Sequence, residues 1–160
     1  MTTFNPYDIG CEPSPSVPCE TLIQDSEDTF LIFYSSNRAS EVIVVECENC
    51  VSSCFGYPND EGLPEHPHYG DGLSTSRASI LVSDDSPWLS NISAQMRKSS
   101  LRIWGGRGMT VPEEHHKQFH FIVPLKEKTF ECIASGLRVA HRAAGFDEAF
   151  AYVRYRFSQH

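Results

Sequence analysis

The chain has 160 residues, of which 40% are hydrophobic and 21% are charged, and its formal net charge is -8. These values are ordinary for a globular protein and exclude a disordered, collagen-like or coiled-coil chain. No apolar run approaches the roughly 18 residues of a membrane-spanning helix. Residues 1–6 show no basic stretch followed by an apolar one, so the sequence predicts no secretory signal and we expect a cytoplasmic protein.

Charge is divided unevenly along the chain. Residues 1–96 hold two basic residues and fifteen acidic ones, a net charge of -13. Residues 97–160 hold eleven basic residues and six acidic ones, a net charge of +5. Two interpretations stay open. Either the two halves touch and partly neutralise each other, or the acidic half binds a protein partner with a basic surface. The excess of acid argues against nucleic-acid binding.

The first part of the chain changes character at residue 29. Residues 1–28 carry four prolines without hydrophobic periodicity, which indicates an irregular N-terminal arm. Residues 29–34 are aromatic and apolar on both faces, as in a central strand, and residues 41–47 supply a β-branched partner. Their short connection favours an antiparallel hairpin. Further strands are predicted over residues 51–55 and 77–83.

A helix is predicted after the second of these strands. Ser86 supplies an oxygen-bearing cap, and Pro87 stands where its missing N–H is no loss. Apolar residues then recur every three or four positions from Leu89 to Met96, which predicts a helix over residues 87–99. For residues 101–109 we expect at most a short strand followed by a flexible loop.

The last third predicts a second hairpin and a closing helix. Residues 117–124 and 129–134 alternate as two strands, and a bulge at Gly136 would let the second strand continue. An apolar stripe predicts a helix over residues 146–157. We therefore expect one α+β domain over residues 29–160, with a mainly antiparallel sheet of five or six strands, one inserted helix and one C-terminal helix. The residues expected in its core are Phe30, Ile32, Phe33, Val42, Val44, Ile80, Leu89, Ile92, Phe121, Phe130, Phe150 and Val153.

Three cysteines follow the second strand with the spacing C-x2-C-x3-C. Cys47 and Cys50 have the separation that supplies two of the four ligands in many structural zinc sites, and Cys54 is near them. The sequence has no second C-x2-C pair. The alternative is plain burial, because free cysteine is among the most buried residue types. Without a secretory signal we expect reduced thiols rather than disulfides.

The motif His66-Pro67-His68 is the second candidate for a site. Side chains two residues apart in extended chain project to one side, and this arrangement serves metal sites on strands. Asp71 or Glu65 would add an oxygen ligand for a divalent metal such as zinc. The alternative is a polar surface loop stiffened by proline.

A second histidine cluster, residues 113–120, leads into a later strand. If the sheet brings His120 beside the H-x-H motif, three ligands become available, and Glu61 is the candidate base for a metal-bound water. Two functions therefore stay open: a binding domain without catalysis that acts through the acidic half, and a metal-dependent hydrolase centred on His66 and His68. Neither a glycine-rich phosphate loop nor a G-x-S-x-G nucleophile motif occurs.

Overall fold

The computed structural model describes residues 2–75, 80–108 and 116–160. Within these ranges nine strands form two antiparallel sheets, accompanied by two α-helices and four short 3-10 helices. The strands are β1 (Asn5–Tyr7), β2 (Thr21–Gln24), β3 (Thr29–Tyr34), β4 (Val42–Glu48), β5 (Ser52–Gly56), β6 (Ile80–Ser83), β7 (Phe119–Pro124), β8 (Thr129–Ala134) and β9 (Gly136–Ala143). The helices are η1 (Leu63–Glu65), η2 (Tyr69–Asp71), η3 (Leu73–Thr75), α1 (Pro87–Trp104), η4 (Gly105–Arg107) and α2 (Phe146–Phe157).

The predicted α+β class with antiparallel pairing is confirmed, but the strands form two sheets rather than one. One sheet has the order β1-β6-β7-β8-β5 and the other the order β2-β3-β4-β9. Both predicted hairpins, β3–β4 and β7–β8, are present. The chain crosses between the sheets after β1, after β4 and after β8. The last two crossings are joined where the amide of Ser135 donates to the carbonyl of Glu48 at 2.8 Å.

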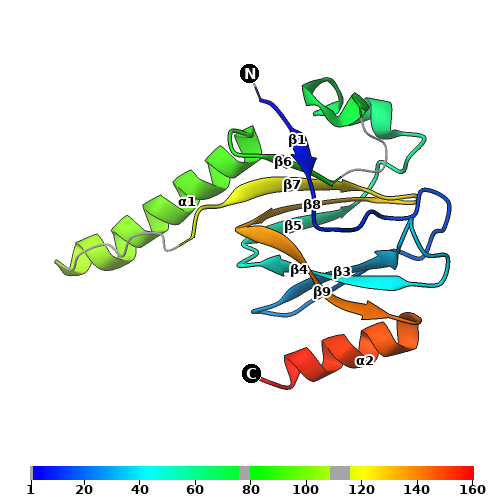
Figure 1. The fold of residues 1–160 in the computed structure, drawn as a ribbon. Coiled ribbons are helices and arrows are strands. Elements are labelled where there is room, and N and C mark those ends of the chain that lie inside the picture. Colours follow the sequence, from blue (N-terminus) through cyan, green and yellow to red (C-terminus); the bar gives the residue numbers. More distant parts are fainter. Residues whose placement is uncertain (1, 76–79, 109–115) are drawn as a thin grey trace.

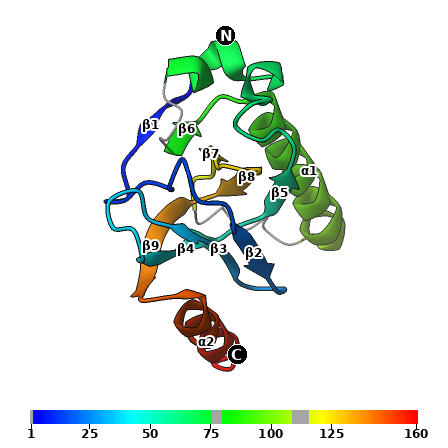
Figure 2. The same cartoon turned by 90° about the vertical axis from the view of Figure 1, so that its right-hand side faces the viewer.

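The elements are stacked in four layers (Figure 1). The inner faces of the two sheets enclose the main core, which contains Leu31, Phe33, Phe121 and Phe130. Helix α2 covers the outer face of the four-stranded sheet through Ala149 and Val153. The segment from η1 to η3 lies at the opposite end of the molecule from α2, as the turned view in Figure 2 also shows.

The core agrees with the sequence prediction at all but two positions. Ile92 and Phe150 are half-buried, and the other ten residues are buried. In the part of the chain that the structure describes, no helix has the length and apolar character needed to cross a membrane.

The expected irregular arm, residues 1–28, contains two short strands. β1 pairs with β6 at the edge of one sheet, and β2 pairs with β3 at the edge of the other. Strands of three and four residues are too short to display an alternating pattern. Pro6 also argues against a strand, but an edge position tolerates proline because one side of the strand has no partner.

Three other expectations need correction. α1 continues through Leu101 to Trp104, and η4 follows, where we expected a strand and a loop. β9 is a separate strand that pairs with β4 in the other sheet, and is no extension of β8 past a bulge. The segment around His66-Pro67-His68, for which a polar surface loop was the alternative, forms three 3-10 helices over residues 63–75. For β9, the partner that decides the conformation is distant in sequence.

Candidate functional site

The H-x-H motif lies against the outer face of the five-stranded sheet. Strands β7 and β8 place His120 and Glu131 on this face, because Ile122 and Glu131 are register partners and His120 is two residues before Ile122. The segment from η1 to η3 covers the face and buries Leu63 and Leu73 beside Phe4. Gly72 has φ +127°, and a Cβ there would overlap the carbonyl oxygen of Phe4, so only glycine allows this close approach.

Glu131 bridges two buried histidines. Its Oε1 lies 3.0 Å from His66 Nε2, and its Oε2 lies 2.8 Å from His120 Nε2. Burial raises the pKa of the carboxyl group, but the hydrogen bonds of His120 and His66 outweigh this and lower it to about 2. Glu131 is therefore a carboxylate that accepts from both rings.

The other nitrogen of each ring is also paired. His66 Nδ1 accepts from the backbone N–H of His68 at 3.1 Å, so the ring proton of His66 must be on Nε2. His120 Nδ1 lies 2.9 Å from Ser86 Oγ, which accepts from the amide of Leu89 at 3.1 Å. Because the Glu131 carboxylate accepts from His120 Nε2, the hydroxyl proton of Ser86 is directed to His120 Nδ1, and both rings carry a proton on Nε2.

His68 and Asp71 form a second pair beside this network. His68 Nδ1 lies 2.9 Å from Asp71 Oδ2, and both residues are half-buried. The His68 ring centroid is 5.8 Å from that of His66 and 5.6 Å from that of His120. The structure therefore brings together His66, His68, Asp71 and His120, which the hydrolase hypothesis required to converge from both halves of the chain.

The remaining acids of the hypothesis are elsewhere. Glu61 is exposed and helps to line a separate cavity of about 290 Å³, whose lining residues within the described chain are Asp60, Glu61, Leu63, Pro64 and Tyr69. Glu65 is exposed. Of the second histidine cluster, residues 113–115 lie outside the described residues, and His116 is exposed.

The side chains of this site that could bind a metal are hydrogen-bonded to other groups of the site instead. Among residues 2–75, 80–108 and 116–160, no group of three histidine, cysteine, aspartate or glutamate side chains is arranged to hold a metal ion. A metal on His66 Nε2 would require the ring proton on Nδ1, where the amide of His68 already donates. In this conformation the geometry is that of a hydrogen-bonded network.

Sequence reasoning missed Glu131, the centre of the network. The alternation of residues 129–134 predicted the strand and placed Phe130 in the core, but it gave Glu131 no role. The sequence did contain a pattern that could have indicated Glu131. It shares a strand face with apolar Ile133, and the corresponding face of the neighbouring strand carries His120 and Ile122. An acid on an otherwise apolar strand face needs a polar partner there.

The C-x2-C-x3-C cysteines do not converge as a group. Cys47 on β4 is buried, Cys50 is half-buried in the link to β5, and Cys54 on β5 is exposed. Cys132 of β8 lies between Cys47 and Cys50 and interacts with both thiols. Sequence spacing could not indicate this contact, because β8 lies about 80 residues further along the chain.

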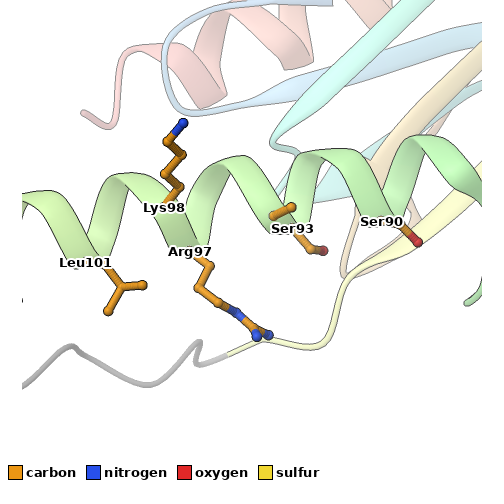
Figure 3. Close-up of a pocket in the computed structure, with 6 residues that line it drawn as sticks. Ser90, Ser93, Arg97, Lys98 and Leu101 are labelled. Atoms are coloured by element: carbon orange, nitrogen blue, oxygen red, sulfur yellow. The ribbon is translucent and has the colours of Figure 1, made fainter.

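Helix α1 carries the other candidate surface. The helix projects from the sheets (Figure 1), and Leu89 in its first turn is its only buried residue among those described. Leu101 is 54% exposed and Ile103 is 44% exposed. A groove of about 460 Å³ runs along the helix, and Figure 3 shows Arg97 and Leu101 on one side of α1, with Lys98 on the other. The groove is lined by Ser90, Ser93, Ala94, Arg97, Lys98 and Leu101.

The charge of this helix differs from that of the whole protein. α1 and η4 contain four cations and no acid, in a chain of net charge -8. The four cations are Arg97, Lys98, Arg102 and Arg107, and within the described residues none of them forms an ion pair. Elsewhere five cations of the second half are paired with acids of the first, as Arg142 is with Glu41 at 3.0 Å.

Comparisons of the chain with family models, with curated proteins and with solved structures find no match.

Proposed function

We propose that this protein is a binding domain without catalysis that docks an acidic segment of a partner protein along helix α1. The observation that carries the proposal is the combination, on α1 and the adjoining η4, of four cations without an ion pair among the described residues, exposed leucine and isoleucine side chains, and a groove of about 460 Å³. Exposed apolar groups bordered by like charges are typical of an interaction surface for an oppositely charged partner.

The proposal moves the docking surface away from the acidic half of the chain. Several acids of that half are engaged by cations of the other half: Asp60 lies 2.7 Å from Lys126, and Glu46 lies 3.0 Å from Arg156. These contacts support the interpretation that the halves partly neutralise each other. The same contacts weaken the case for a partner with a basic surface, because the acids are already satisfied.

The test is capture from lysate with matched charge-reversal variants. We expect a partner that the wild-type protein retains at 0.1 M salt and releases at 1 M, because the screening length falls from about 10 Å to about 3 Å. The Arg97→Glu/Lys98→Glu variant should lose that partner. The control, Lys128→Glu/Arg154→Glu, reverses two exposed cations away from α1 and should retain it.

A second measurement locates the contact. Amide hydrogen exchange in residues 90–101 should slow when the captured partner is added back to the wild-type protein. Retention by the α1 variant, equal loss with the control, or a preference for RNA or phosphatidylserine vesicles over protein would each contradict the proposal.

The metal-dependent hydrolase is a second candidate, favoured by one observation: His66, His68, Asp71 and His120 lie together although they come from distant segments. It requires the network around Glu131 to rearrange so that ring nitrogens become free. Elemental analysis of untagged protein should then find stoichiometric zinc or another divalent metal that survives Cys47→Ser/Cys50→Ser and is lost with His66→Ala/His68→Ala. Protein that takes up no metal on reconstitution would exclude this candidate.

A further inference from the structure

Three thiols meet at the end of the sandwich where the chain crosses between the sheets. Cys132 on β8 and Cys47 on β4 are buried between the two inner faces. Cys50 lies in the link between β4 and β5 and packs against the core cluster that contains Cys132, whose side-chain hydrogen bond lowers the pKa of Cys50. Cys132 also contacts the thiol of Cys47. The sulfurs therefore form a row, Cys50–Cys132–Cys47, that starts at a half-buried residue and ends in the core.

The polar surroundings of Cys50 favour its thiolate. The side chain of Thr29 hydrogen-bonds to its sulfur and helps to lower the pKa of Cys50. The contact with Cys132 lowers the pKa of Cys50 to about 7, although burial opposes this. Burial raises the pKa of Cys132 far above its usual value and raises that of Cys11, a buried thiol outside the row, to about 11. Cys50 is thus the thiol of this row that is suited to react near neutral pH.

We propose that Cys50 and Cys132 form a redox site in which Cys50 is the thiol that reacts with a hydroperoxide and Cys132 is the thiol that resolves the product. The Cys50 thiolate attacks the peroxide O–O bond, takes one oxygen to become a sulfenic acid and, with one proton, releases the alcohol or water. The Cys132 thiol then attacks the sulfenic sulfur, a disulfide forms, and water leaves. The peroxide is the oxidant, and its oxygen is reduced by two electrons. This site is independent of the docking surface on α1.

The experiment is oxidation of the full-length reduced protein with hydrogen peroxide, followed by alkylation and peptide mapping by mass spectrometry. The expected product is a Cys50–Cys132 disulfide. The Cys54→Ala control removes an exposed thiol of the neighbouring strand and should form the same disulfide at the wild-type rate. In Cys132→Ala, Cys50 should stop at a sulfenic acid that dimedone traps.

Because Cys132→Ala could fail to fold, a variant of the less buried Cys50 provides a second test. Cys50→Ser should leave Cys47 and Cys132 reduced under the same treatment, because the reactive thiol is gone. The pH dependence of Cys50 alkylation in the wild-type protein should have its midpoint near 7. The proposal is overturned if Cys50 reacts no faster than Cys54 at neutral pH, or if peroxide yields no Cys50–Cys132 disulfide.

Discussion

Glu131 is the acceptor that decides the protonation of its neighbours. Its two oxygens face the Nε2 atoms of His66 and His120, so each ring must donate to it. His66 is fixed in this tautomer by the amide of His68, but His120 is not, because Ser86 Oγ can either donate to Nδ1 or accept from it. A change at Glu131 therefore has an unequal effect on the two histidines.

The Glu131→Gln substitution tests this inequality. A glutamine presents one acceptor and one donor, so His66 should keep its Nε2 proton and face the amide oxygen, while His120 should move its proton to Nδ1. Long-range ¹H–¹⁵N correlation of the imidazole nitrogens measures both tautomers. We expect the free energy of unfolding to fall by about 2 kcal/mol, since a charge-assisted bond is lost.

Glu127→Gln is the matched control, because Glu127 is exposed in the turn between β7 and β8. It should change stability by less than about 0.5 kcal/mol. Protonation of His120 on Nε2 in the Glu131→Gln variant would contradict the assignment of the network.

The lowered pKa of Glu131 also predicts a pH dependence. Because the pKa is about 2 in the folded protein and near 4.5 in the unfolded chain, the carboxylate stabilises the fold fully above pH 4.5. This contribution, on the order of 2–3 kcal/mol, is lost as the pH falls from 4.5 towards 2. Denaturant unfolding of wild type and Glu131→Gln at several pH values measures it, and the difference between them should shrink over that window. A constant difference would show that Glu131 is not the responsible group.

At the scale of the element, α1 is anchored at its beginning, and none of its later residues is fully buried among those described. Ser86 is fully buried, caps the helix through the amide of Leu89, and contacts His120. Leu89 is the anchor in the first turn, whereas Leu101 and Ile103 near the end are exposed. The histidine network and the start of α1 are therefore one connected unit.

Ser86→Ala should lower the free energy of unfolding by about 1–2 kcal/mol, because it removes the cap and leaves His120 Nδ1 without its partner. Urea denaturation measures the loss. Ser90→Ala, one turn later on the exposed side of the same helix, is the control and should cost less than about 0.5 kcal/mol. Equal losses for both variants would mean that the cap is not important.

At the scale of the whole molecule, charges from the two halves of the sequence meet. The Glu46 carboxylate on β4 accepts hydrogen bonds from Arg138 on β9 and from Arg156 on α2. The bond with Glu46 raises the pKa of Arg156. The three residues connect the last helix to the four-stranded sheet. The uneven charge along the chain is thus partly balanced in space.

Glu46→Gln should lower the free energy of unfolding by roughly 1–3 kcal/mol, because two arginines lose a largely buried anion. Glu48→Gln is the control: Glu48 also pairs with Arg138, but its side chain is 42% exposed, so its pair is worth about 0–1 kcal/mol. Chemical denaturation gives both values. A larger loss for Glu48→Gln would contradict this ranking.

Local patterns in the sequence determined much of the fold. The β-branched and aromatic runs predicted β3 and β4, alternation predicted β7 and β8, and the apolar stripe predicted α2 with the bounds that the structure shows. The cap at Ser86 predicted where α1 begins. These features depend on neighbours within a few residues, so the sequence alone carries them.

The tertiary structure decided what depends on distant partners. Nothing local indicates that β9 pairs with β4, which places it in the second sheet. The sequence supplied His66, His68, Asp71 and His120 as candidates, but only the pairing of β7 with β8 and the covering segment 63–75 brought them together. The role of Glu131 and the contact of Cys132 with Cys47 and Cys50 were missed, because a side chain's partners are set by the register of strands far apart in sequence. A single sequence does not record that register.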